Sequence, residues 1–153
     1  QKYSGQSLTY RDTETNKEYT PWDIETSAGV DRSLLFFLLD AYRKDDKREW
    51  LQLHPKLAPY KAAVFPLVAN KPNLVAKAGE IYHNLRKSIM VSWDDRGNIG
   101  KRYAAQDEVG TPFCITVDYT TLEDQTVTVR ERDSMEQKRV PVSELSNFLL
   151  KVL

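Results

Sequence analysis

Residues 97–118, GNIGKRYAAQDEVGTPFCITVD, decide the fold of this chain because they join a helix to an apolar strand. The first half predicts a helix over 99–109, and the Gly-Thr-Pro run at 110–112 ends it. The apolar run 113–119 predicts a strand, and the alternating run 126–132 predicts a second one. Because only the short segment TTLEDQ separates these strands, they are expected to pair antiparallel.

Strands and helices alternate on both sides of this stretch. Upstream, the unbroken apolar run 62–67 is typical of a strand covered on both faces. A helix capped by Asn73 follows, and then a short strand at 90–93. Downstream, 138–142 predicts a fifth strand ahead of a last helix. Since strand and helix alternation gives parallel pairing through right-handed crossovers, the sequence predicts an α/β fold, a mixed five-stranded sheet flanked by helices, over 61–153.

The first part of the chain, residues 1–48, has a different organisation. Two alternating runs around the polar segment 12–17 predict an antiparallel hairpin, whose second strand includes 22–27. A helix over 30–44 follows, and its centre SLLFFLLDAY is apolar nearly all round, which is typical of a buried helix. A hairpin and one helix are too small for a domain, so we expect a remnant of a larger antiparallel domain. The proline-containing segment 49–60 predicts a linker.

Composition places the chain among soluble globular proteins, with 41% hydrophobic residues, 29% charged residues and a formal net charge of zero. The net charge of zero argues against a protein that binds long nucleic-acid duplexes through charge alone. It does not argue against a domain that binds one folded RNA. The single cysteine, Cys114, excludes an intramolecular disulfide and favours a cytoplasmic setting. His54 and His83 are too isolated for a metal site or a catalytic dyad, so no metal site is predicted.

Two long, ungapped motifs resemble a known family. Residues 97–140 resemble the anticodon-binding domain of glycyl-tRNA synthetase of the bacterial homodimeric type, a class II aminoacyl-tRNA synthetase. Residues 25–32, ETSAGVDR, resemble the third class II motif, which closes the catalytic domain. The resemblance implies that 1–48 is the C-terminal remnant of the catalytic domain, 49–60 a linker and 61–153 the anticodon-binding domain.

The resemblance also implies a function, that of the C-terminal part of a glycine–tRNA ligase. The parent enzyme would activate glycine with ATP and Mg²⁺ and transfer it to tRNA(Gly), as a cytoplasmic homodimer without a membrane partner. We expect no cofactor on this chain alone. We also expect no synthesis of glycyl-adenylate by it, because no segment supplies the first two class II motifs.

The motif at 25–32 offers groups for a small amino acid and a nucleotide. In an extended strand Glu25 and Ser27 share one face, where a carboxylate and a hydroxyl suit an ammonium group. Arg32 would lie in the first turn of the next helix, where a guanidinium suits a phosphate. By the resemblance, Glu25 and Ser27 bind glycine, while Arg32 is catalytic and binds the terminal phosphate of ATP. Thr26 stands where the family has proline.

The same residues leave a purely structural alternative open. In it Ser27 caps the helix. Arg32 then pairs with Glu25 or Asp31, and the segment binds no ligand.

The polar face of strand 126–132 is the predicted RNA-reading surface. Val127 and Val129 face the core, so the threonines and arginines between them are expected to form an exposed stripe. Sequence-specific RNA readers stack unpaired bases on guanidinium planes and bind base edges, and arginine suits both. Together with the neighbouring helix and loop, this reasoning gives six candidates for anticodon contacts: Arg130, Arg132, Thr121, Glu123, Arg102 and Gln106.

Other interpretations stay open from the residues alone. Arg132 on an edge strand can simply discourage aggregation, and Glu123 lies where turns favour acidic residues for conformational reasons. The whole chain has two alternative functions. One is a non-catalytic nucleic-acid-binding accessory module that reuses the anticodon-binding fold. The motif at 25–32 argues against this function. The other is a small α/β protein-interaction domain, which the neutral net charge favours.

Overall fold

The computed structural model describes residues 2–152, and these fall into two compact units that divide after Ser33. In the first unit, strands β1 (Tyr10–Arg11) and β2 (Glu18–Tyr19) pair antiparallel, with Tyr10 opposite Tyr19. The predicted hairpin is therefore present around its polar turn, but it is much shorter than expected.

The strand predicted over 22–27 is wrong. Residues 20–29 have no regular secondary structure, and their side chains are exposed. A strand needs a partner for its backbone N–H and C=O groups, and the described part of the chain provides none here. The alternation that suggests a strand in the sequence is thus not sufficient to form one.

The second unit is built on a mixed five-stranded sheet in the order β6-β5-β7-β8-β9. Its strands are β5 (Ala62–Pro66), β6 (Val91–Trp93), β7 (Phe113–Val117), β8 (Thr126–Glu131) and β9 (Gln137–Pro141). Strand β5 pairs parallel with β6 and β7, whereas β7 with β8 and β8 with β9 pair antiparallel. The predicted fold class is confirmed.

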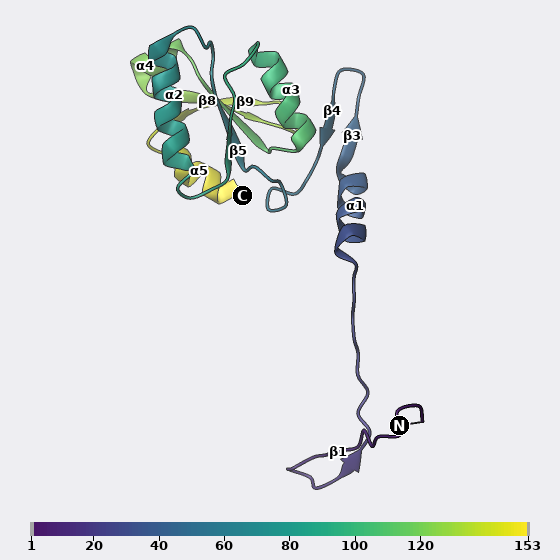
Figure 1. Ribbon diagram of the computed structural model, residues 1–153. Helices are drawn as coiled ribbons and strands as arrows, with labels where there is room; N and C mark the ends of the chain where they lie inside the picture. Colours follow the sequence, from purple (N-terminus) through teal and green to yellow (C-terminus); the bar gives the residue numbers. More distant parts are fainter. Residues whose placement is uncertain (1, 153) are drawn as a thin grey trace. The chain divides into compact units, whose positions relative to one another are not determined.

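Helices cover both faces of this sheet, as Figure 1 shows. They are α2 (Pro72–Leu85), α3 (Ile99–Val109) and α5 (Leu145–Val152). Helices α2 and α5 pack on one face and bury leucine and isoleucine side chains against the valines of β7 and β8. Helix α3 packs on the opposite face, over Ala63, Phe65 and Cys114. Strands β5 and β7 are therefore buried on both sides, which explains their unbroken apolar runs.

The ends of α2 and α3 follow local sequence signals. Lys71, not Asn73, is the N-cap of α2, because Pro72 occupies the first helical position, where a missing N–H costs nothing. Helix α3 has the predicted bounds. Asn98 caps it by accepting a hydrogen bond from the Lys101 N–H at 2.9 Å, and Gly110 ends it in the left-handed conformation at φ 84°.

The segment before the sheet differs from the prediction. Helix α1 (Val30–Ala41) ends at Ala41 instead of residue 44, and a hairpin of β3 (Tyr42–Lys44) and β4 (Glu49–Leu51) follows. The Asp45 carboxylate closes the turn by accepting hydrogen bonds from the N–H groups of Lys47 and Arg48, at 2.7 and 2.8 Å. Residues 43–51, predicted as helix end and linker, are thus an ordered hairpin.

The apolar centre of α1 is exposed. Residues 34–39 keep between 37% and 65% of their surface accessible. The burial that this composition predicts is therefore not supplied by the residues that the structure describes. Within 2–152, no helix combines the length and the hydropathy that crossing a membrane requires.

Candidate nucleic-acid interface

The arginines predicted to form an exposed stripe are buried. Arg130 is 7% and Arg132 is 3% exposed, so the prediction of a solvent-facing stripe is wrong for both arginines, whereas Thr126 and Thr128 of the same face are half-buried. For Arg130 the physical reason is helix α3, which covers the C-terminal end of β8 on this face and provides an acidic partner. Both terminal nitrogens of Arg130 donate to the two carboxylate oxygens of Asp107 on α3, each at 2.9 Å. Burial opposes the charge of Arg130, but these hydrogen bonds outweigh it and raise the pKa of the guanidinium.

Asp107 also binds a second guanidinium, that of Arg48 from the β3–β4 turn. Arg48 Nη1 lies 3.0 Å from Asp107 Oδ2 and 2.6 Å from the carbonyl oxygen of Arg132. Its Nη2 donates to the carbonyl of Asp133 at 3.0 Å. Arg48, Asp107 and Arg130 form what we call the Asp107 cluster. It ties the β3–β4 hairpin to α3 and to the end of β8.

Arg132 connects three further parts of the second unit. Its guanidinium donates to the carbonyl oxygen of Gly110 at 2.7 Å and to that of Leu53 at 3.0 Å. It also forms a two-point pair with Asp133, at 2.8 and 2.9 Å. Burial would raise the pKa of Asp133, but the hydrogen bond from Arg132 prevails and lowers it. The Arg132 guanidinium is therefore hydrogen-bonded to two backbone carbonyls and one carboxylate.

Two more predicted candidates, Arg102 and Gln106, are also buried, at 2% and 8% exposure. Gln106 donates to the Ser92 hydroxyl at 3.2 Å and accepts from the Thr111 hydroxyl at 2.6 Å. The Arg102 guanidinium donates to four backbone carbonyls, those of Pro66, Asp95, Arg96 and Gly97. These contacts fix the loop between β6 and α3 and leave no free edge for a nucleotide.

The last two candidates lie in α4 (Tyr119–Asp124), a short helix where the sequence predicts only a turn. Thr121 is fully buried and forms a capping box with Asp118, each donating its N–H to the other's side chain at 3.1 Å. Glu123, in contrast, is exposed. Of the six predicted candidates, Glu123 alone presents its side chain to solvent.

An open polar surface lies on the α3 side of the sheet, on the parts of β8 and β9 that α3 does not cover. Thr128 of β8 pairs with Thr116 of β7, which contacts α3 through the Tyr103 hydroxyl at 2.6 Å. On its other side Thr128 pairs with Arg139 of β9. We call this surface the β8–β9 polar strip, and its members are Asp118, Asp124, Thr126, Thr128 and Arg139.

Arg139 organises the strip. Its Nη1 donates to Asp118 Oδ2 at 2.5 Å and to the Thr128 hydroxyl at 3.1 Å, and its Nε donates to the Thr126 hydroxyl at 2.8 Å. Nη2 donates to the carbonyl oxygen of Thr126 at 3.1 Å. The Arg139 side chain nevertheless keeps 36% of its surface exposed. Arg139 thus provides the accessible guanidinium that the sequence predicted at Arg130, and its hydrogen bonds fix its orientation.

Sequence reasoning missed Arg139 and Asp118. The position of Arg139 depends on the register between β8 and β9, which places it opposite Thr128. The turn at 132–136 sets that register. The length of the turn alone does not reveal which residues of β8 and β9 lie opposite each other. Asp118 carries a local signal, because an acidic residue three positions before a threonine is typical of a helix N-cap.

The residues predicted to bind glycine and ATP lie in the first unit. Glu25, Ser27 and Arg32 are all exposed, and Arg32 lies in the first turn of α1, as predicted. Within the described residues, none of the three side chains forms a hydrogen bond or ion pair. The structural alternative, a cap from Ser27 and a pair from Arg32, is therefore not observed. Their roles toward glycine and ATP stay predictions.

The sequence of this chain is similar to known proteins along nearly its whole length. The anticodon binding domain family matches residues 61–152. The glycine–tRNA ligase of Alkaliphilus oremlandii is 52% identical over 153 residues, which cover 97% of this chain and 32% of that protein. That of Bacillus cereus is 50% identical over 154 residues, covering 98% and 33%. The chain thus spans about a third of the length of the curated relatives it matches.

A solved structure supports the fold independently. Prolyl-tRNA synthetase from Cryptosporidium parvum, determined in complex with halofuginone and AMPPNP, superimposes with a TM-score of 0.62 at 28% identity. The match covers 66% of this chain and 22% of that one.

Proposed function

The chain belongs to the anticodon binding domain family, and from this premise we propose that it is the tRNA-reading part of a glycine–tRNA ligase. The observation that carries the proposal is the 52% identity to such a ligase across 97% of this chain, which extends well beyond the family domain at 61–152. The contact surface that we assign to the RNA is the β8–β9 polar strip with the adjoining Glu123.

The chemistry of the strip suits unpaired bases. Arg139 is held in place by several hydrogen bonds, so little conformational entropy is lost when a base stacks on its guanidinium plane. Asp118 and Asp124 flank it, which disfavours phosphate and favours base amino groups. Glycine codons begin with two guanines, so a glycine anticodon carries adjacent cytosines, and the cytosine N4 amino group donates to carboxylates. Glu123, exposed and without a side-chain partner among the described residues, is the acceptor we assign.

For the whole protein we propose glycine activation with ATP and Mg²⁺ in a cytoplasmic homodimer. Glu25 and Ser27 would hold the glycine ammonium group, and Arg32 the terminal phosphate of ATP. The exposed positions of all three, and the place of Arg32 in the first turn of α1, fit these roles. The 153-residue chain by itself is expected to form no glycyl-adenylate. Glycine-dependent pyrophosphate exchange by the purified chain would contradict that expectation.

Anticodon reading is tested by titrating the chain with transcripts of tRNA(Gly) at low, stated salt. A matched transcript in which only the two anticodon cytosines are replaced serves as the control. We expect about tenfold or more weaker binding of the control, because a good base-edge contact discriminates by ~1 to 3 kcal/mol. Equal affinity for both would remove the claim of anticodon reading, as an accessory nucleic-acid-binding module predicts. Binding to neither would favour a protein-interaction domain.

A further inference from the structure

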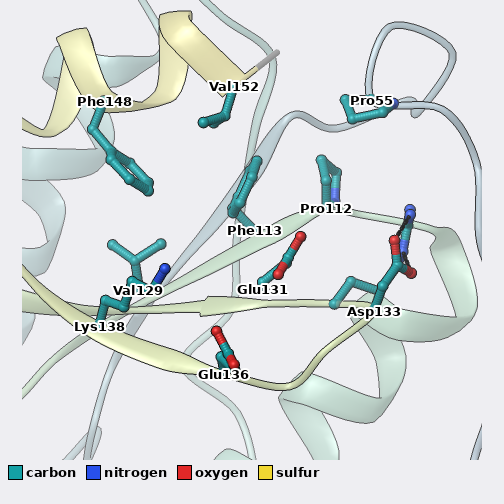
Figure 2. Close-up of a pocket in the computed structure, with 11 residues that line it drawn as sticks. Pro55, Pro112, Phe113, Val129, Glu131, Asp133, Glu136, Lys138, Phe148 and Val152 are labelled. Carbon is teal, nitrogen blue, oxygen red and sulfur yellow. Dashed lines mark hydrogen bonds and ion pairs between the residues drawn. The ribbon is translucent and has the colours of Figure 1, made fainter.

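On the sheet face opposite the polar strip, a concave site opens beside the end of α5. Its cavity has a volume of about 250 Å³. Figure 2 shows Phe148 and Val152 of α5 and Pro55 along one side, and strand residues such as Val129 and Glu131 along the other. None of the RNA-contact residues assigned above lines it. It therefore needs its own explanation.

The interior of this cavity is apolar. Phe113 and Phe148 meet edge to face with ring centroids 6.2 Å apart, and Val129 and Val152 complete the lining together with Pro112. An edge-to-face pair leaves ring surface open for a further apolar group. The volume is below the ~300 to 1,000 Å³ of drug-sized sites, so it suits a body of the size of one aromatic ring or a branched alkyl chain.

The polar groups at the cavity favour a cation. Glu131 and Glu136 line it, and both residues are exposed at the surface. Among the described residues that line the cavity, Lys138 is the one positive group without an ion pair, because Arg132 is bound to Asp133 and to two backbone carbonyls. Glu131 accepts one hydrogen bond, from the Ser134 hydroxyl at 2.6 Å, and retains further acceptor capacity. Glu136 has no side-chain hydrogen bond to the described residues.

We propose that this cavity binds a small organic amine, with its apolar body against Phe113 and Phe148 and its ammonium group at Glu131 and Glu136. An ammonium group donates to carboxylates, whereas a carboxylate ligand would meet two like charges. A ligand of this size binds with a dissociation constant on the order of 1 mM, since small ligands gain a limited free energy per atom. The site is separate from the RNA surface, so it stands or falls independently of the proposed function.

The test is a methyl and aromatic NMR titration of the full chain with 2-phenylethylamine. Its matched probes are 2-phenylethanol, which lacks the charge, and 3-phenylpropionate, which reverses it. We expect saturable shifts at Val129, Val152 and Phe148 with the amine. The alcohol should bind about fivefold to tenfold more weakly, as expected for partly exposed charge pairs. The propionate should not bind measurably.

Variants assign the charge preference to particular residues. The double variant with Glu131→Gln and Glu136→Gln should bind the amine and the alcohol with equal affinity. Lys138→Met should tighten amine binding about twofold to fivefold by removing a like charge. Glu144→Gln, an exposed residue outside the cavity, should change nothing. Absence of saturable shifts with the amine, or equal affinity for amine and alcohol in the unchanged chain, would overturn the proposal.

Discussion

Arg130 and Asp107 form a two-point ion pair in the interior of the second unit, with both N–O distances at 2.9 Å. Asp107 is 2% and Arg130 is 7% exposed. The pair joins the C-terminal end of β8 to helix α3, and Asp107 extends the contact to Arg48 at 3.0 Å. Strand β8, which carries Thr126 and Thr128 of the proposed RNA surface, is thus anchored by Asp107, a residue that lies outside that surface.

Asp107→Asn is expected to be strongly destabilising. It removes the carboxylate shared by two guanidiniums and leaves Arg130 and Arg48 without a counter-charge. Breaking a buried pair in this way costs about 3 to 5 kcal/mol in free energy of unfolding. Urea unfolding followed by circular dichroism measures it, with Glu108→Gln, the exposed neighbour on α3, as the control. A loss no larger than that of the control would refute the anchoring role of the Asp107 cluster.

Gly110→Ala is expected to destabilise the junction between α3 and β4. Gly110 has φ 84°, and a Cβ there would lie 2.9 Å from the carbonyl oxygen of Leu51 and 3.0 Å from Leu53 Cδ1. The left-handed conformation and the contact together should cost about 2 kcal/mol or more. Gly79→Ala in α2 is the matched control, because nothing lies within 4 Å of its added Cβ. That change should stabilise the chain by up to about 1 kcal/mol.

The outcome that would contradict this account is similar thermal stability of the two alanine variants. It would mean that Gly110 is not required for its backbone conformation or for the approach of Leu51.

The thiol of Cys114 is expected to be inert in the folded chain. Cys114 is 1% exposed, and burial, followed by the nearby charge of Asp107, raises the pKa of its thiol from 9.0 to about 12. Since the thiolate is the reactive species, its modification by a disulfide reagent should be roughly a thousandfold slower than in the unfolded chain. Ser146→Cys supplies an exposed comparison thiol on α5. Equal rates for both thiols in native buffer would refute the buried position.

Acid should remove the contribution of Arg139 to stability. Burial would raise the pKa of Asp118, but hydrogen bonds from Arg139 and Thr121 outweigh it and hold the pKa below its ordinary value of 3.8. A carboxylate whose pKa is lower in the folded state stabilises that state at pH values above its unfolded-state pKa. This stabilisation is lost as the pH falls through the folded-state pKa. Arg139→Gln should therefore lower the free energy of unfolding by at most about 1 kcal/mol at neutral pH.

The difference between Arg139→Gln and the unchanged chain should shrink below about pH 4 and vanish at still lower pH. Urea titrations from neutral pH into the acid range measure both proteins side by side. A difference that stays constant, or grows toward acid, would show that the pair with Asp118 is not its source.

Local signals in the sequence predicted the sheet and the bounds of α3. Gly110 ends that helix, as the run at 110–112 predicted, and its own left-handed backbone places this end without a distant residue. The alternation of Val127 and Val129 likewise identified the buried face of β8. For α3 and β8 the deciding signals lie within a few residues of the element, whereas the cap expected at Asn73 was overridden by its neighbour Pro72.

The candidate site could not be predicted to the same degree, because it depends on partners distant in the chain. Alternation assigns Arg130 to a face of β8, but only packing reveals that α3 covers that face and brings Asp107, which lies 23 residues away, against it. Arg139 requires the register of β9. The segment 22–27 shows the reverse error, because it alternates like a strand yet has no partner among the described residues.

The central claim, that the β8–β9 polar strip reads the anticodon, is tested most directly by comparing Arg139→Gln with Arg86→Gln in binding to tRNA(Gly). Arg86 is exposed at the end of α2, outside the strip, so both changes remove one accessible positive charge. We predict that Arg139→Gln weakens binding by about tenfold to a hundredfold, as loss of a stacking contact does, and Arg86→Gln by less than about threefold. A folded Arg139→Gln chain that binds tRNA(Gly) as tightly as the Arg86→Gln chain, and still distinguishes the anticodon, would contradict the account.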